Sequence, residues 1–354
     1  MRTVTIMRSF AKGAWSVVAL DIGIDLGTYS TYAVDREGST VLREPSVVAM
    51  DKRTGKMIGA GDAVLNMVGK VPGHIEVVYP LQDGVISDFD MTEVLIKHLI
   101  KKITNNQLLK PRVCLCVPSV VTGVEVQAVI DATMSAGARK VYLIEEPVAA
   151  AIGAGIDLSL PYGNMIVDVG GGTCDVAVLS LNGIVCKTSL KVAGHAFDQA
   201  LIKYARHRYN LLIGAPTAER IKIEAGAVCT GFEPATADAK GRDLVSGLPK
   251  KVAITREDSI GPLSEPMAQI LQAIVSVLEK TPPELAADIR TGGIVLTGGG
   301  ALITGFAEAI ERRTNIPTRL APDPERCVAI GTAKSFDYLD VLYDGFVTTR
   351  DASR

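Results

Sequence analysis

The sequence Asn164-Met-Ile-Val-Asp-Val-Gly-Gly-Gly-Thr-Cys-Asp-Val-Ala-Val-Leu-Ser180 contains two apolar runs that are separated by three glycines and a threonine. The runs, 165–169 and 176–179, are rich in β-branched residues and predict a strand, a tight turn and a second strand. Glycine backbone can approach an anion closely and direct N–H groups at it, and the threonine hydroxyl adds a donor. Asp168 would repel a bare phosphate, but not one that carries a divalent cation. A glycine-rich hairpin without a ligand is the alternative interpretation of this stretch alone.

A related pattern occurs near the start of the chain. Residues 17–24 read as an apolar strand that ends in Asp25-Leu-Gly-Thr28, and a further hairpin follows the turn, as it does after the first stretch. Such self-similarity implies two related structural units that face each other. Their loops could hold one polyphosphate from both sides, with Asp25 and Asp168 on either side of its metal ion.

A third glycine cluster, Thr297-Gly-Gly-Gly-Ala301, follows the apolar run 293–296 and precedes a helix-like run over Leu302–Thr314. Glycines at this place allow a flat ring or a ribose to pack directly on the backbone.

With these three loops the chain resembles the superfamily of actin, sugar kinases and heat-shock chaperone ATPases, and within it most resembles the MreB family of bacterial actin homologues. The matches to the superfamily are Asp25–Thr28 and Asp168–Thr173 for the two phosphate loops, Ile144–Gly153 for the connecting helix, and Gly298–Gly300 for the adenosine loop. The narrower assignment depends on longer strings at Glu44–Ala49, Pro80–Asp90, Tyr209–Gly214, Gly241–Val245 and Thr281–Asp288. Together the matches run from about residue 20 to residue 334, and their order is more specific than any single loop.

The resemblance implies an α/β fold of the actin-like, or ribonuclease H-like, kind. It consists of duplicated mixed-sheet domains with two small peripheral subdomains that flank a nucleotide cleft. The alternation of strand and helix over residues 111–155 fits such a sheet with covering helices. The expected parts are an N-terminal amphipathic arm (1–17), domain I (18–155 and 325–345, with a small subdomain at about 45–81), domain II (156–324, with a small subdomain at about 195–257) and a polar tail (346–354).

The resemblance also implies ATP and Mg²⁺ as cofactors and assigns residues to them. The metal ligands are expected at Asp25 and Asp168, and the catalytic residues are expected at Glu146, Thr173 and Asp175. The nucleotide contacts are expected at Gly27, Thr28, Tyr29, Ser30, Gly170, Gly171, Gly172, Thr173, Glu219, Lys222, Gly298, Gly299, Gly300 and Ala301.

Two adjacent glutamates, Glu145 and Glu146, lie where a strand meets a helix beside the expected phosphates. A carboxylate there can orient a water for in-line attack on the terminal phosphoryl group. Glu146 matches the family's catalytic position, although a glutamate at the start of a helix can also serve only to cap it. The chain departs from the family at three positions: MreB proteins usually carry Thr and Glu where it has Cys174 and Asp175, and Asn where it has Ser30. These departures affect the expected geometry of water activation and the rate of hydrolysis.

Glu219 and Lys222 share one face of an expected helix, at positions i and i+3. Without the resemblance we would interpret them as a solvated ion pair. The chaperone ATPases are similar in placing Glu and Lys at this spacing on the adenosine, and this favours ribose or adenine contact.

Composition limits the class of protein. A chain of 354 residues with 47% hydrophobic residues can bury more than one core, so two domains are expected. A net charge of −2 argues against a general nucleic-acid binder. The six cysteines have neither zinc-site nor disulfide-framework spacing, and we expect reduced core residues of a cytoplasmic protein. None of the four histidines has metal-site spacing, so surface or core positions are expected for them. The sequence shows neither a bilayer-spanning run nor a cleavable signal.

The arm that precedes the first strand is a separate question. On a helix, Val4, Met7, Ala11 and Trp15 would fall on one face, and three basic residues would supply positive charge. This pattern is typical of a membrane-surface anchor, as the resemblance to MreB also implies, but a disordered or core-docked terminus remains the alternative.

Other segments give simpler predictions. The pattern predicts a strand over Glu44–Met50, a short helix over Gly59–Val71, an irregular segment over Thr230–Asp238 and a strand over Arg242–Leu248. It also predicts a helix over Asp88–Thr104, capped by Asp88 or Asp90.

The function that the resemblance implies is that of a filament-forming ATPase. Its subunits would join head to tail, and such heterologous contacts generate open filaments. The implied partners are other copies of the chain, the inner face of the cytoplasmic membrane and membrane proteins of cell-wall synthesis, with a role in cell shape and a location in the cytoplasm, peripheral at the membrane. The alternatives are a nucleotide-switched chaperone, which would need a peptide-binding domain, a sugar or acetate kinase, and another actin-like filament protein.

Overall fold

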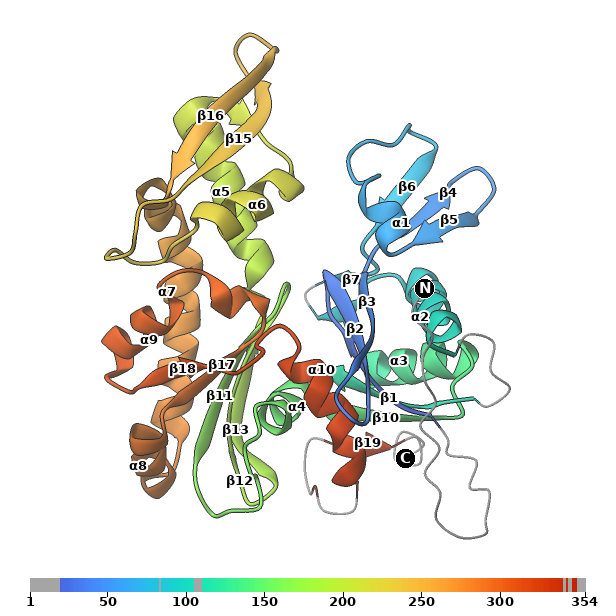
Figure 1. Cartoon of the computed structure of the whole chain (residues 1–354), viewed down its shortest axis with the longest axis vertical. Helices are drawn as coiled ribbons and strands as arrows, with labels where there is room; N and C mark the ends of the chain where they lie inside the picture. Colours follow the sequence, from blue (N-terminus) through green and yellow to red (C-terminus); the bar gives the residue numbers. More distant parts are fainter. Residues whose placement is uncertain (1–19, 83, 105–109, 340–341, 343–345, 349–354) are drawn as a thin grey trace.

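A computed structural model describes residues 20–82, 84–104, 110–339, 342 and 346–348, arranged as two halves side by side (Figure 1). Each half has a large sheet below and a smaller lobe above it (Figure 1). The expected N-terminal arm and most of the expected tail lie outside the described residues. The domain boundaries expected from the sequence remain a prediction.

The first half is built on a six-stranded sheet with the order β19-β10-β9-β1-β2-β3. Its strands are β1 (Asp21–Leu26), β2 (Ser30–Asp35), β3 (Thr40–Pro45), β9 (Arg112–Val117), β10 (Lys140–Glu145) and β19 (Phe346–Thr348). The first three strands form an antiparallel meander, and β9 and β10 extend it in parallel. β19 pairs with β10, so the paired structure extends into the segment that the sequence assigns to the tail.

The second half repeats this arrangement in a five-stranded sheet with the order β13-β12-β11-β17-β18. Its strands are β11 (Asn164–Val169), β12 (Cys174–Ser180), β13 (Gly183–Leu190), β17 (Ile294–Thr297) and β18 (Thr318–Leu320). Here too a three-stranded antiparallel meander is extended by two parallel strands. The duplication predicted from the two glycine loops is therefore present in the topology, and each loop joins the first two strands of its sheet.

The smaller lobes have their own short sheets. The lobe of the first half contains β4 (Val48–Asp51), β5 (Lys56–Ala60), β6 (Ile75–Val78) and α1 (Asp62–Leu65), and the lobe of the second half contains β14 (Leu211–Leu212), β15 (Thr236–Asp243), β16 (Pro249–Thr255) and α6 (Ala215–Ala225). A short hairpin of β7 (Leu81–Gln82) and β8 (Val85–Ile86) lies near the first lobe.

The remaining helices cover the sheets and connect the halves. They are α2 (Phe89–Thr104), α3 (Gly123–Ser135), α4 (Glu146–Gly153), α5 (Gly194–Tyr209), α7 (Arg256–Lys280), α8 (Pro283–Gly292), α9 (Phe306–Thr314) and α10 (Cys327–Lys334), with 3₁₀ turns η1 (Gly299–Leu302) and η2 (Ser335–Asp337). Asp88 is the residue that caps α2, because its carboxylate accepts a hydrogen bond from the Met91 N–H at 3.0 Å.

Helices α4 and α10 cross between the two halves (Figure 1). Their backbones approach closely because glycines face the partner helix: a Cβ on Gly331 would overlap the backbone of Ala149, and one on Gly153 would overlap the carbonyl of Cys327. Apolar residues from both helices and from both sheets form one buried cluster around this crossing. The crossing therefore ties the two halves together below the lobes.

Four predicted elements differ from those observed. The strand expected over Glu44–Met50 is divided, since β3 ends at Pro45, which has no N–H to donate, and β4 begins at Val48. Of the helix expected over Gly59–Val71, only the four residues of α1 are α-helical. The strand expected over Arg242–Leu248 lies earlier in the chain, as β15, because Asp243 accepts backbone N–H groups from Val245 and Ser246 and so ends β15 in a turn. The helix expected from Leu302 begins only at Phe306.

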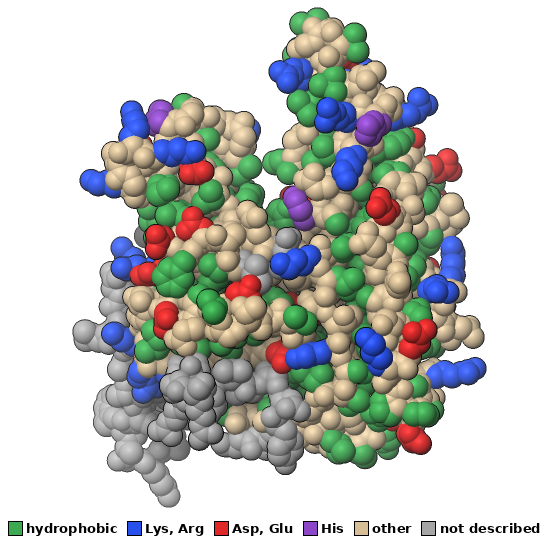
Figure 2. Space-filling model, turned by 180° about the vertical axis from the view of Figure 1, so that it is seen from behind, with side chains coloured by type: hydrophobic (Ala, Val, Ile, Leu, Met, Phe, Trp, Pro, Cys, Tyr) green, Lys and Arg blue, Asp and Glu red, His purple; other side chains and the backbone are tan. Residues whose placement is uncertain are grey.

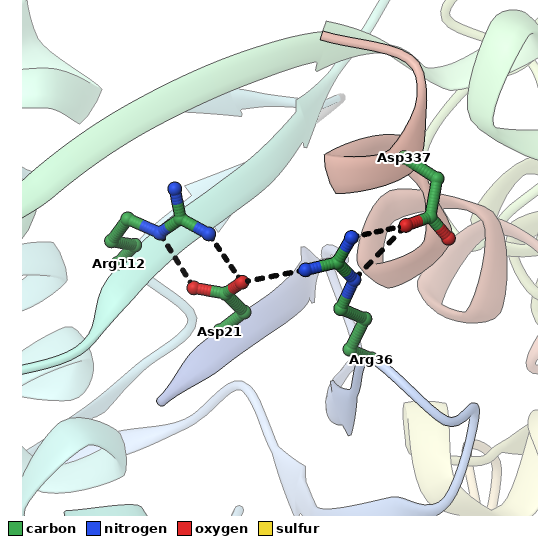
Figure 3. A network of polar contacts seen from close by, with 4 residues as sticks. All are labelled: Asp21, Arg36, Arg112 and Asp337. Atoms are coloured by element: carbon green, nitrogen blue, oxygen red, sulfur yellow. Dashed lines mark hydrogen bonds and ion pairs between the residues drawn. The ribbon is translucent and has the colours of Figure 1, made fainter. Parts of the chain in front are cut away.

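An ion-pair network fastens the end of α10 to the first sheet (Figure 3). Asp21 on β1 is nearly buried and pairs with Arg112 of the adjacent β9 and, at 3.5 Å, with Arg36. Arg36 also pairs with Asp337 of η2. The guanidinium of Arg112 lies 5.2 Å from the centre of the Phe336 ring, which adds a cation–π contact.

Candidate functional site

A cavity of about 350 Å³ lies where the two halves face each other, within the range of small-molecule sites. Figure 2 shows the molecule from behind, hollowed between the two upper lobes. Both glycine loops line the cavity, and so does the third cluster. The predicted residues on its wall are Asp25, Gly27, Thr28, Tyr29, Ser30, Glu146, Asp168, Gly170, Gly171, Gly172, Thr173, Glu219, Lys222, Gly298, Gly299 and Gly300.

The loop between β1 and β2 has its carbonyl groups engaged away from a ligand. The hydroxyl of Ser46 donates to the carbonyl of Gly27 at 2.6 Å, and the N–H of Ser46 donates to the carbonyl of Tyr29 at 2.9 Å. Since backbone carbonyls repel phosphate oxygens, their engagement by Ser46 favours an anion at this loop.

The loop between β11 and β12 is held in the same way from its own half. The N–H of Gly194, at the start of α5, donates to the carbonyl of Gly170 at 3.1 Å, and the N–H of His195 donates to the carbonyl of Gly171 at 2.8 Å. A Cβ on Gly171 would overlap the ring of Tyr29, so glycine is required by this approach. Different neighbours therefore engage the carbonyl groups of the two loops. The electrostatic effect is the same, because in each loop these carbonyls are kept from repelling an anion.

Of the two aspartates predicted as metal ligands, Asp168 is buried and Asp25 is partly buried, and both line the cavity. Burial raises the pKa of Asp25 to about 6 and that of Asp168 to about 7. A hydrogen-bond donor partly stabilises the ionised form of each carboxyl group. The thiol of Cys116 lies 3.2 Å from Asp25, and the hydroxyl of Thr297 donates to Asp168. Two desolvated carboxyl groups that line one cavity suit a hard divalent cation, whose charge would offset the cost of ionising them.

Glu146, which is partly buried, and the fully buried Asp175 form a second acidic pair beside the first. Asp175 lies directly opposite Asp168 in the register of β12 and β11, which places both side chains on one face of the sheet. The N–H of Ser119, in the loop after β9, donates to Asp175 at 2.9 Å. Burial is the main cause that raises the pKa of Glu146 well above its usual range, and the neighbouring Asp175 adds to it. Glu146 lines the cavity, whereas Asp175 is fully buried and is not among the residues that line it.

The third glycine cluster lines the cavity next to the end of β11. Gly298 has a φ of +82°, and a Cβ there would overlap the backbone of Val169, so this turn packs tightly on β11. Gly298, Gly299 and Gly300 reach the cavity, but Ala301 does not line it and is instead buried in the core of the second half. The expectation that Ala301 contacts the nucleotide finds no support in its position.

Lys222 lines the cavity, but its ion-pair partner is not Glu219, the residue that the helical spacing suggests. Its ammonium group lies 2.9 Å from the carboxylate of Asp198 on α5 and 3.2 Å from the carbonyl of Gly194. Asp198 is 2% exposed, so the pair is largely removed from solvent. Glu219, one turn earlier on α6, also lines the cavity.

The relationship of the chain to known proteins follows from sequence and structure together. A profile of the MreB/Mbl protein family matches residues 19–343. The chain belongs to the MreB/Mbl family. The cell shape-determining protein Mbl of Bacillus subtilis is 45% identical over 325 residues, which cover 92% of this chain and 98% of that protein. The cell shape-determining protein MreB of Escherichia coli is 44% identical over 327 residues, which cover 91% and 94%.

Solved structures of this family have the same fold. MreB5 of Spiroplasma citri bound to ADP matches with a TM-score of 0.86 at 38% identity, over 91% of this chain and 97% of that chain. The same protein bound to AMPPNP matches with a TM-score of 0.84. The fold of this MreB/Mbl family member is therefore the actin-like fold predicted from the sequence. Membership of the family leaves no place for the chaperone-like and sugar kinase interpretations.

Several residues of the site were not found from the sequence. Ser46, Ser119, Asp198 and His195 each fix a loop or a charged group, and all act through contacts with residues far away in the chain. Ser46 and Ser119 follow prolines at the ends of strands, which is the one local signal that could have pointed to them. His195 and Asp198 lie in the first turns of α5, and only the position of that helix brings them to the cavity.

Other expectations concern the whole chain. All six cysteines are among the described residues and are free; four of them are buried in the core, whereas Cys186 and Cys229 are only partly buried. Among the helices that the structure describes, none is long and apolar enough to cross a bilayer.

Proposed function

We propose that this protein binds ATP with Mg²⁺ in the cavity between its halves and hydrolyses it to ADP and phosphate. The observation that carries this proposal is the pair of desolvated aspartates, Asp25 and Asp168, each near the end of a strand that leads into a glycine loop on the same cavity. The names of the two MreB5 structures, bound to ADP and AMPPNP, support a nucleotide as the ligand. We place the boundary between the domains after residue 155 and again at residue 325.

The parts of the nucleotide are assigned from the walls of the cavity. The triphosphate would lie between the two loops, at Gly27–Ser30 and at Gly170–Thr173. The nucleoside would lie between α6, with Glu219 and Lys222, and the glycines 298–300. Bound Mg²⁺ would supply positive charge to the phosphate oxygens, and Asp25 and Asp168 would hold it directly or through water.

Glu146 is the residue that we assign to activation of the attacking water. It begins α4 and lines the cavity with the phosphate loops; Asp175 interacts with it directly and Thr173 lines the same cavity, and we assign both as positioning groups. The carboxylate of Glu146 would accept a hydrogen bond from the water and orient it toward the terminal phosphoryl group. Glu145, its neighbour, pairs instead with Lys187 of β13 at 2.6 Å, which supports a structural role for it.

The cellular function that we propose is assembly into membrane-associated filaments that organise cell-wall synthesis and set cell shape. The curated relatives are named as cell shape-determining proteins, and they match nearly the whole chain. The amphipathic arm, with Trp15 and its basic residues, is the segment that we propose for contact with the inner face of the cytoplasmic membrane.

Sedimentation tests both parts of this proposal. Protein with ATP and Mg²⁺ is expected to pellet as polymer, and to co-pellet with liposomes that contain anionic lipid. The Trp15→Ser variant is expected to polymerise but to bind liposomes less. If folded protein shows no ATP-dependent pelleting or light scattering, with or without liposomes, the filament proposal is wrong.

A further inference from the structure

A direct hydrogen bond joins the two halves at the phosphate end of the cavity. The hydroxyl of Tyr29, in the first phosphate loop, lies 2.5 Å from Nδ1 of His195, the second residue of α5 in the other half. The two residues are 166 positions apart in the sequence. Tyr29 itself lines the cavity, so this bond spans the place where the phosphates are proposed to bind.

The ring of Tyr29 is packed between groups from both halves. On one side it lies against the Cα of Gly171 in the second phosphate loop, since a Cβ built there would overlap the ring. On another side the ring of Tyr79 lies 5.5 Å away, centre to centre, at an angle of 53°. The aromatic side chain therefore covers the gap between the two phosphate loops.

His195 is held in place for this contact. Its backbone N–H donates to the carbonyl of Gly171 at 2.8 Å, and the amide nitrogen of Gln199 lies 3.4 Å from its Nε2. An amide nitrogen is a donor only, so this contact favours the tautomer of His195 in which Nε2 accepts and Nδ1 carries the proton. In that tautomer His195 donates to the oxygen of Tyr29, and contacts with its own helix orient the imidazole.

Other polar contacts between described residues also join the halves, but at a different place. The N–H of Ser119 donates to Asp175, and Lys187 pairs with Glu145. These four residues are not among the described residues that line the cavity. These contacts therefore join the halves away from the cavity wall, whereas Tyr29 lines the cavity and bonds to His195.

We propose that Tyr29 and His195 form a latch that retains the nucleotide, which makes His195 an additional positioning residue of the nucleotide site. The inference rests on the proposed binding of a nucleotide in this cavity. Phosphates held between the two loops can leave only when the loops separate or when the Tyr29 side chain swings aside. Either movement breaks the bond between Tyr29 and His195, so the bond slows release.

The test measures how fast the protein releases a fluorescent ADP analogue when it is chased with unlabelled ADP. Tyr29→Phe removes the hydroxyl and keeps the ring, and His195→Ala removes its partner. Each is expected to speed release by about 2- to 12-fold, which is the range that one net hydrogen bond supplies. The double variant is expected to release no faster than the faster single variant, because both changes break the same bond.

Matched controls separate the latch from a general loss of structure. Tyr162→Phe changes an exposed tyrosine, and His207→Ala changes an exposed histidine of the same helix, α5; both are expected to release at the wild-type rate. His195→Asn keeps a donor near the position of Nδ1 and is expected to lie closer to wild type than His195→Ala.

Three results would overturn the latch. Release at the wild-type rate from both single variants, while wild type binds the analogue, would remove the latch and leave the proposed function intact. Strictly additive effects in the double variant would show that the two residues act independently. Absence of binding to wild type would overturn the proposed function and the latch together.

Discussion

The backbone N–H of Ser119 donates a hydrogen bond to the carboxylate of Asp175 at 2.9 Å, and this bond joins the end of β9 in one half to β12 in the other. Asp175 is fully buried, faces Asp168 across its strand pair and raises the pKa of Glu146. The acidic groups proposed for hydrolysis therefore lie at the junction of the two halves. Their geometry depends on how the halves are placed, which couples the chemistry to the closure of the cleft.

Glu146→Ala is expected to retain binding of ATP and to slow release of phosphate by about 100-fold or more, the range for loss of a positioned base. Phosphate release under single-turnover conditions and equilibrium binding of AMPPNP measure the two effects separately. Glu145→Ala serves as the control, since that residue pairs with Lys187 and is expected to change the rate little. A variant at Glu146 that hydrolyses ATP like wild type would remove the catalytic assignment.

The pH dependence of stability is expected to report the titration of the two cavity aspartates, Asp168 and Asp25. Asp168 has a pKa of about 7 in the folded protein, against an ordinary value of 3.8, so the folded state binds more protons than the unfolded state between about pH 4 and pH 7. Its contribution to stability is present below about pH 4 and is lost as the pH rises through 7. Asp168→Asn is therefore expected to become more stable than wild type by a margin that grows over this window and levels off above it.

Thermal unfolding of both proteins without nucleotide or divalent cation, across that pH range, measures this margin. Asp25 is expected to behave in the same way over a narrower window, because its pKa is about 6. A margin that does not vary with pH would mean that these carboxyl groups titrate normally in the folded protein.

The network in Figure 3 predicts unequal effects for its two arginines. Arg112→Ala would leave the nearly buried Asp21 with only the longer contact to Arg36, and we expect a loss of about 1–3 kcal/mol in the free energy of unfolding. Arg36→Ala removes a pair with the half-exposed Asp337 and is expected to lose less than about 1 kcal/mol. Urea unfolding gives both values, and a larger loss for Arg36 would contradict this ranking.

The close crossing of α4 and α10 predicts that replacement of Gly331 destabilises the folded protein. Gly331→Ala places a methyl group against the backbone of Ala149, and such overpacking costs about 1–3 kcal/mol or more. Gly123→Ala in α3 is the control, because the space around that glycine is open and alanine favours a helix. A midpoint of thermal unfolding that is lowered by the first change and kept or raised by the second is the expected result. Equal midpoints would show that the helices can separate without cost.

The parts of the fold that the sequence predicted are those encoded locally. The glycines after Asp25 and Asp168 predict turns from the local sequence alone. The repeat of this pattern predicts the duplication. The cap of α2 was limited to two candidates, because Asp88 and Asp90 both precede the apolar repeat. The chain alone could not choose between them, since the choice depends on which carboxylate reaches the N–H of Met91.

What the sequence could not show depends on distant contacts. Lys222 suggested a pair with Glu219 by helical spacing, but its partner is Asp198, which another helix brings to it. The end of β15 is set by the hydrogen bonds of Asp243, whereas apolar residues after it suggested that the strand continued. His195 has no metal-site spacing, and its contact with Tyr29 exists only because the two halves face each other.

The most direct test of the proposed site is a crystal structure of the protein with AMPPNP and Mg²⁺. We expect the triphosphate between the loops at 27–30 and 170–173, with the metal ion held by Asp25 and Asp168 directly or through water. A nucleotide bound elsewhere, or a metal ion remote from both aspartates, would contradict the account.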